Sequence, residues 1–146
     1  MLPDAVLAAS TVDTRTTRWR GILANGDTDV TLAVDGQAIV GFAAACPQRS
    51  PELSALGFPG EISALYLLRT AQRAGTGRRL MRAAAGNLLF RGFAAAGIWV
   101  LDANASARGF YGRLGGTVVA RRADRYPGGD LPVVAYGFDL ARLATA

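Results

Sequence analysis

The chain has 146 residues, the length of a single domain, and its 51% apolar and 18% charged residues exclude a disordered or fibrous protein. Its apolar runs are far shorter than the roughly 20 residues of a membrane span. Met1 is not followed by a signal-peptide pattern, so we expect a cytoplasmic protein. Histidine and lysine are absent and Cys46 is the single cysteine, which excludes imidazole catalysis, Schiff bases, internal disulfides and cysteine-cluster metal sites; we expect no metal.

The net charge of +5 favours an anionic partner. All 16 basic residues are arginines, and they occur as pairs and singles without a long run. Nucleic-acid-binding proteins usually carry a denser basic stripe or interleaved aromatic residues. A small anionic molecule is therefore the favoured ligand, and an arginine-rich nucleic-acid binder remains an alternative.

The first part of the chain predicts helices followed by a β-hairpin. Apolar spacing and turn residues favour these elements. The expected segments are a short helix over Leu2–Val12, a helix over Thr14–Ala24, strands over Asp29–Val34 and Ala38–Cys46, and a loop over Pro47–Gly60.

The remainder predicts strands and helices in alternation. The expected segments are a strand over Glu61–Leu68, a polar connection over Arg69–Ala74, a helix from Gly75 to about Arg91, a strand over Ile98–Asp102, a helix over Asn104–Leu114, and strands over Thr117–Arg122 and Val133–Leu140 around a turn-rich Pro127–Pro132. This order predicts a single α/β domain with a mixed, mostly antiparallel sheet. The one parallel strand–helix–strand crossover runs from Glu61 to Asp102.

The connection from Gln72 to Gly77 has the composition of an anion-binding loop. Gly75 and Gly77 stand on either side of the residue that opens a predicted helix, so the backbone can approach a ligand closely. The first-turn N–H groups and about half a positive charge at the helix terminus favour an anion there. The arginines beside this terminus are Arg73, Arg78 and Arg79. A tight strand-to-helix turn would also explain the two glycines, and the pattern is neither a Walker A loop nor a complete dinucleotide fingerprint.

A second group of polar residues follows the strand that ends at Asp102. Asn104 is a natural helix N-cap, and Arg108 and Tyr111 fall on the same helix face four and seven residues later. This face and the start of the Gly75 helix both lie at the carboxyl end of the parallel strands, where open α/β sheets bind ligands. A phenol in such a crevice can donate a proton, although Tyr111 could equally be a packing aromatic.

Together these two stretches resemble the GNAT acyltransferase superfamily. Its acetyl-CoA signature is a strand, then Q/R-x-x-G-x-G/A, then a helix, and residues 72–77 read Q-R-A-G-T-G. Its later N-x-x-A-x-x-x-Y pattern reads N-A-S-A-R-G-F-Y at residues 104–111, followed by Leu114 and Gly115. The resemblance extends from about Val30 to Leu140 and implies an acetyl-CoA-dependent N-acetyltransferase acting on a primary amine of a small molecule or peptide.

The resemblance also implies roles for single residues. A bulge in the first parallel strand would free the N–H of Leu67 to polarise the thioester carbonyl, which is an oxyanion role. Tyr111 would protonate the departing CoA thiolate. The amine would attack directly in a ternary complex, without a covalent acyl-enzyme. The expected cofactor-binding residues are Leu67, Leu68, Arg69, Gln72, Arg73, Gly75, Thr76, Gly77, Arg78, Arg79, Leu80, Asn104 and Arg108.

A general base for the acceptor ammonium is harder to assign. Some relatives carry a glutamate on the strand before Asn104, where this chain has Trp99. Glu61 is the first choice, although six residues of regular strand would put it about 20 Å from Leu67, so a water chain or a bent strand is needed. Glu52 is the second choice, and Cys46 is expected to pack as a small hydrophobe.

The start of the chain departs from the family pattern. GNAT domains usually begin with a strand and a long helix, and both are expected to be missing here. The strand Asp29–Val34 would then be a sheet edge and part of one sheet face would be open, which predicts a homodimer. A CoA-binding sensor or regulatory module without turnover is the alternative function, and the acceptor itself is not identifiable.

Overall fold

The computed structural model describes residues 12–146. The predicted helix Leu2–Val12 lies almost wholly outside the described residues. The described elements are α2 (Val12–Asn25), β1 (Asp29–Asp35), β2 (Ala38–Pro47), α3 (Pro51–Ala55), β3 (Gly60–Leu67), a 3-10 turn η1 (Arg69–Ala71), α4 (Thr76–Phe90), β4 (Ala95–Leu101), α5 (Ala105–Arg113), β5 (Thr117–Tyr126), β6 (Gly129–Asp139) and α6 (Leu140–Leu143).

The strands form one six-stranded sheet in the order β1-β2-β3-β4-β6-β5. Four of the neighbouring pairs are antiparallel, and β3 and β4 are the parallel pair, joined by the crossover through α4. The predicted fold class is therefore confirmed, and among residues 12–146 β1 is an edge strand of the sheet. Within residues 12–146, no helix has both the length and the apolar character needed to cross a bilayer.

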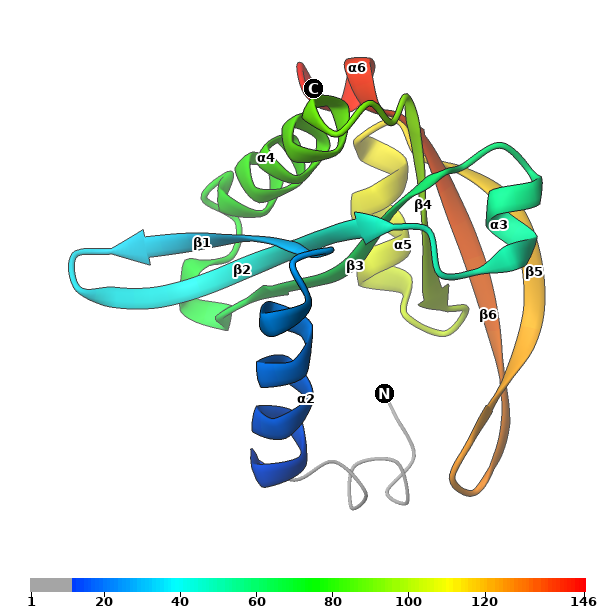
Figure 1. Ribbon diagram of the computed structural model, residues 1–146, viewed down its shortest axis with the longest axis horizontal. Helices are drawn as coiled ribbons and strands as arrows, with labels where there is room; N and C mark the ends of the chain where they lie inside the picture. Colours follow the sequence, from blue (N-terminus) through cyan, green and yellow to red (C-terminus); the bar gives the residue numbers. More distant parts are fainter. Residues whose placement is uncertain (1–11) are drawn as a thin grey trace.

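The larger core lies between one sheet face and the helices α4, α5 and α6. Figure 1 shows α4 on one side of the β1–β2 hairpin and α2 on the other. Buried residues of α4 such as Met81 and Leu88 pack with Ile62 of β3 and Phe138 of β6. Since α4 buries one whole stripe of its surface, it is held firmly against the sheet with its first turn at the sheet's open end.

A bulge in β3 explains the irregular apolar spacing of this strand. Ala44 pairs with Ala64 and Ala45 pairs with Ile62, so Ser63 is the extra residue. A bulge shifts the alternation of side chains by one position. Leu65 therefore faces the same core as Ile62, although the two stand three positions apart.

The segment predicted as a loop between β2 and β3 contains the short helix α3, which corrects the expectation for Pro47–Gly60. Ser50 caps α3 by accepting a hydrogen bond from the N–H of Leu53, and a proline occupies its first turn. The segment packs on the sheet face opposite α4, over two paired glycines. A Cβ at Gly97 would lie 3.0 Å from Leu53, and one at Gly137 would lie 2.5 Å from the Phe58 ring. This sheet face is therefore partly covered within the described chain.

Two boundaries near the C-terminus also differ from the prediction. The segment Pro127–Pro132 was expected to be rich in turns, but β5 extends to Tyr126 and β6 begins at Gly129. The connection is a tight hairpin, because Gly128 and Gly129 adopt positive φ angles. The short helix α6 was not predicted, and Asp139 caps it through its side chain.

Candidate active site

The site begins where β3 and β4 separate. The parallel pairing covers Gly60 with Ala96 and Glu61 with Gly97, and the rest of β3 has no β4 partner among the described residues. The two strands therefore diverge toward their carboxyl ends. An opening of this kind exposes strand N–H and C=O groups to a ligand.

Leu67 presents its backbone to this opening. The N–H of Leu68 donates to the carbonyl of Val40 at 2.8 Å. Antiparallel alternation then turns the N–H and C=O of Leu67 away from β2. The Leu67 carbonyl accepts a hydrogen bond from Gln72 Nε2 at 3.1 Å. The bulge expected at Leu67 lies at Ser63 instead, yet the Leu67 N–H points toward the opening.

The loop before α4 has an uncommon backbone conformation. Gly75 is the N-cap of α4 and has φ 80°, a left-handed conformation that favours glycine. Arg73 has φ 65° and is the one non-glycine residue with positive φ within residues 12–146. Such a conformation costs about 1–3 kcal/mol and concentrates at functional sites. Gly77 serves close packing, since a Cβ there would lie 3.3 Å from the Phe110 ring.

The start of α4 is strongly positive. The first intrahelical bond runs from the N–H of Arg79 to the carbonyl of Gly75, so the N–H groups before Arg79 have no helical acceptor. Four exposed arginines surround this turn, and none of them forms an ion pair within the described chain. They are Arg69, Arg73, Arg78 and Arg79. Free N–H groups beside unpaired guanidinium groups are the donors that suit a diphosphate.

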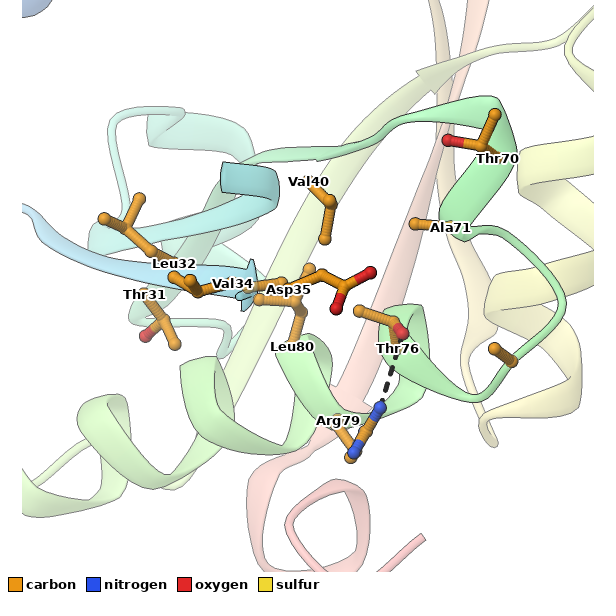
Figure 2. A pocket seen from close by; sticks show the side chains of 12 residues that line it. Thr31, Leu32, Val34, Asp35, Val40, Thr70, Ala71, Thr76, Arg79 and Leu80 are labelled. Atoms are coloured by element: carbon orange, nitrogen blue, oxygen red, sulfur yellow. Dashed lines mark hydrogen bonds between the residues drawn. The ribbon is translucent and has the colours of Figure 1, made fainter. Parts of the chain in front are cut away.

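A cavity of about 500 Å³ lies on the hairpin side of α4, between β1, β2 and the η1 loop. Figure 2 shows the Asp35 carboxylate directed into it near Thr76. Arg79 donates a hydrogen bond to Thr76 Oγ1 at 3.4 Å. Leu80 and Thr70 also line the cavity. The cavity thus has one carboxylate, Asp35, opposite residues of the turn that precedes and opens α4, including Ala74, Thr76 and Arg79.

Helix α5 carries Tyr111, the candidate phenol of the site. Asn104 is its N-cap, as predicted, and its Oδ1 accepts from the N–H of Ala107 at 3.1 Å. Tyr111 is 6% exposed, and its ring contacts Tyr136 and Phe138 of β6. Burial raises the pKa of Tyr111 to about 12. The phenol therefore keeps its proton at neutral pH.

Residues 6–116 match the acetyltransferase (GNAT) family. This stretch contains both the loop before α4 and the helix that carries Tyr111. The chain belongs to the GNAT acetyltransferase family. It is 41% identical over 69 residues to the N-acetyltransferase YuaI of Bacillus subtilis (strain 168), in a match that covers 47% of this chain and 38% of YuaI. The matched segment thus spans less than half of that relative.

Solved structures share the GNAT fold. A GNAT-family protein from Desulfovibrio desulfuricans has a TM-score of 0.72 at 20% identity, covering 88% of this chain and 80% of its own. A Salmonella typhimurium protein solved with acetyl-CoA has a TM-score of 0.67 at 19% identity, covering 90% and 75%. Arabidopsis thaliana NAA60, in complex with a bisubstrate analogue, has a TM-score of 0.72 at 15% identity, covering 95% and 94%.

The two glutamates of this GNAT chain are both held by arginines. Glu61 Oε2 pairs with Arg49 Nη2 at 2.7 Å, and Glu61 Oε1 accepts from the Arg49 backbone N–H and Nε. Glu52 lies farther from its partner, 3.5 Å from Arg122 Nη1, and is more exposed. Arg49 is a site residue that sequence reasoning missed, because its contact with Glu61 depends on the register of β2 and β3.

Trp99, at the position where some GNAT relatives have a glutamate, carries an arginine on its ring. Arg122 Cζ lies 4.0 Å from the ring centroid, within the range of a cation–π contact. Trp99 Nε1 is buried and has no hydrogen-bond partner in the described part of the chain. Trp99 of β4 and Arg122 of β5 thus form an aromatic–cation pair at the position where some relatives carry the glutamate.

Cys46 is 4% exposed and packs in the sheet, where it pairs with Glu61. Burial, and then the negative charge of Glu61, raise the pKa of this thiol. A buried protonated thiol is a poor nucleophile. The geometry therefore agrees with Cys46 as a small packing residue.

The buried phenol gives an expected dependence of stability on pH. In the unfolded chain a tyrosine loses its proton near pH 10, whereas folded Tyr111 keeps it to about pH 12. The free energy of unfolding should be unaffected by this group below about pH 10 and fall by up to about 3 kcal/mol toward pH 12. Urea unfolding across this window checks the expectation. Tyr111→Phe should remove that share of the alkaline loss, and an equal loss in both proteins would contradict it.

Proposed function

We propose that this GNAT domain transfers an acetyl group from acetyl-CoA to a primary amine of a small molecule or peptide. The observation that supports this most is the opening between β3 and β4. The α4 turn that follows β3 carries four arginines that form no ion pair within residues 12–146, and α5, the helix that follows β4, carries Tyr111. The arginines and free N–H groups suit the diphosphate. The opening suits an extended arm that ends at a thioester.

Two groups of the chain act on the thioester, one on its carbonyl and one on its sulfur. The N–H of Leu67 donates to the thioester carbonyl, where negative charge develops during attack. The Tyr111 O–H donates a hydrogen bond to the departing sulfur. Its pKa of about 12 lies above the value of about 8.5 typical of a thiol, so the phenol acts mainly as a hydrogen-bond donor with partial proton transfer. The amine attacks directly in a ternary complex.

Glu61 is the proposed base, reached through water, and Glu52 is the alternative. The side chain of Glu61 is 14% exposed, so its oxygens retain limited access to solvent beside Arg49. We expect Glu61→Gln to lower kcat/KM about 100-fold at neutral pH, and Glu52→Gln to change it less than about threefold. The reverse order would assign the base to Glu52. A small effect in both variants would leave proton removal to water.

The experiment that tests the function is thiol release from acetyl-CoA across a panel of primary amines and N-terminal peptides, with product mass confirming acetylation. Amine-dependent release is the expected result. Calorimetric titration with CoA accompanies it. Failure to bind CoA at millimolar concentration would overturn both the cofactor site and the proposed activity.

A CoA-binding regulatory module is the second candidate. Trp99 favours it, because it occupies the β4 position of a family carboxylate, and neither its ring nor the Arg122 guanidinium stacked on it from β5 can accept a proton. Binding of CoA without turnover on any amine would support this candidate. Amine-dependent turnover that depends on Tyr111 would exclude it.

The exposed edge of the sheet supports assembly as a homodimer. Leu32, Phe42 and Tyr66 form a cross-strand row, and Leu32 and Tyr66 are 51% and 54% exposed. Val34 and Ile39 extend this apolar surface at the tip of the hairpin, and β1 is the edge strand. Light scattering at micromolar concentration should give twice the monomer mass. Leu32→Asp should shift it to the monomer, and a wild-type monomer without dye-binding apolar surface would contradict the proposal.

A further inference from the structure

A polar network centred on Arg108 includes Tyr136, whose ring lies beside that of Tyr111. Arg108 Nε donates to the hydroxyl of Tyr136 at 3.2 Å. Arg108 Nη1 donates to Asp102 Oδ1 at 2.6 Å and to the Asp102 carbonyl at 3.3 Å. One guanidinium thus joins three elements: α5, the residue that follows β4, and β6.

This network touches the proposed catalytic phenol through Tyr136. The centroids of the Tyr136 and Tyr111 rings are 5.9 Å apart, with an interplanar angle of 50°. Both tyrosines are 6% exposed. Arg108 stands three residues before Tyr111 on α5, so their side chains share a helix face. The hydroxyl of Tyr136 is therefore fixed by Arg108 while its ring packs against Tyr111.

The Tyr111 hydroxyl itself has no hydrogen bond to any residue in the 12–146 range. Its direction depends on the rings around it, and Tyr136 is the one with a polar tether. Arg108 differs from the arginines of the α4 turn because two of its donor nitrogens already bond inward. The side chain of Arg108 is 28% exposed, which is little for a group expected to bind a phosphate.

We propose that Arg108, anchored on Asp102, is a positioning residue that orients Tyr111 through Tyr136. The inference rests on the proposed role of Tyr111 as proton donor. This positioning role differs from the one expected from the sequence, in which Arg108 binds the cofactor. Without Arg108, the buried Tyr136 hydroxyl loses its donor, and the one ion pair left to Asp102 within residues 12–146 is with Arg121, at 3.5 Å.

The kinetic test is a double-mutant cycle between Arg108→Gln and Tyr111→Phe. A small displacement of a reacting group costs up to about 100-fold in rate, so Arg108→Gln should lower kcat about 10- to 100-fold. KM for acetyl-CoA should stay within about threefold. In the Tyr111→Phe background the same change should alter kcat less than about threefold, because the group being oriented is gone.

Two further variants serve as controls for the double-mutant cycle. Arg108→Lys keeps the charge and one donor to Asp102, so it should recover part of kcat. Arg121→Gln removes the other arginine that pairs with Asp102. Because the Arg121 side chain is largely exposed, this change should leave kcat unchanged. Equal losses from Arg108→Gln in both backgrounds would overturn the proposal. A rise in KM at constant kcat would return Arg108 to cofactor binding.

A second readout does not depend on turnover. The protein has four tyrosines, and 13C labelling of the ring Cζ atoms resolves them by NMR. In Arg108→Gln the signals of Tyr111 and Tyr136 should shift, while those of Tyr66 and Tyr126 should not. If wild-type protein acetylates no amine but these shifts occur, the proposed function fails and the positioning contact stands. An unmoved Tyr111 signal would overturn the positioning role in either case.

Discussion

Replacing Tyr111 by phenylalanine should lower kcat for acetyl transfer about 10²–10⁴-fold, the usual contribution of a positioned acid. The substitution removes the hydroxyl and keeps the ring that packs against Tyr136 and Phe138. Since the hydroxyl has no hydrogen bond within residues 12–146, the free energy of unfolding should change by less than about 1 kcal/mol. Steady-state kinetics with saturating acetyl-CoA and urea unfolding measure the two effects.

The control for this variant is Tyr126→Phe. Tyr126 ends β5, in the hairpin with β6, and it is partly exposed. It should keep wild-type kcat and KM. If Tyr111→Phe retains more than about a third of kcat, the phenol is not the proton donor, and Tyr111 is a core aromatic as its burial alone would indicate.

The order of elements and the place of the site follow from local patterns. Gly75 needs a positive φ and Asn104 caps a helix, so both mark the same points in the sequence and in the structure. Such signals involve a few neighbouring residues, which is why they are readable without tertiary information. They predict that the candidate anion-binding turn opens one helix and that the candidate phenol lies on the next, which are α4 and α5 in the structure.

The features that were missed depend on longer range or on conflicting local signals. The helix α3 has its own start signal, Ser50 followed by Pro51 and Glu52, but the prolines and glycines around it outweighed that signal. The bulge at Ser63 appears in the sequence only as an irregular spacing of apolar residues. Its position is set by pairing with β2 and could not be assigned to one residue beforehand.

Contacts between distant residues were not predictable. Arg49 meets Glu61 across twelve positions, and Arg108 meets Tyr136 across twenty-eight. Both pairs require the strand order and register, which the sequence does not state. The same contacts change the interpretation of the site, because they engage a candidate base and a candidate cofactor ligand with other protein groups.

Reversing two charges at the start of α4, in the variant Arg73→Glu/Arg78→Glu, should weaken CoA binding more than about 100-fold. Each charge-assisted hydrogen bond to a phosphate contributes about 1.5–3 kcal/mol, and the new carboxylates repel the diphosphate. Both side chains are exposed and form no ion pair among the described residues, so folding should be preserved. Titration calorimetry with CoA and with pantetheine separates the contribution of the diphosphate from that of the pantetheine arm. Pantetheine lacks the diphosphate, so its affinity should change less than about threefold.

Arg113→Glu is the matched control, because it makes the same change of charge on an exposed arginine at the far end of α5. It should leave CoA affinity within about threefold at 0.15 M salt, where the screening length is about 8 Å. Equal weakening by Arg113→Glu would mean that net charge alone attracts the cofactor. Unchanged CoA binding in the double variant would place the diphosphate elsewhere, and the free N–H groups of the α4 turn would then be only a consequence of the tight strand-to-helix connection.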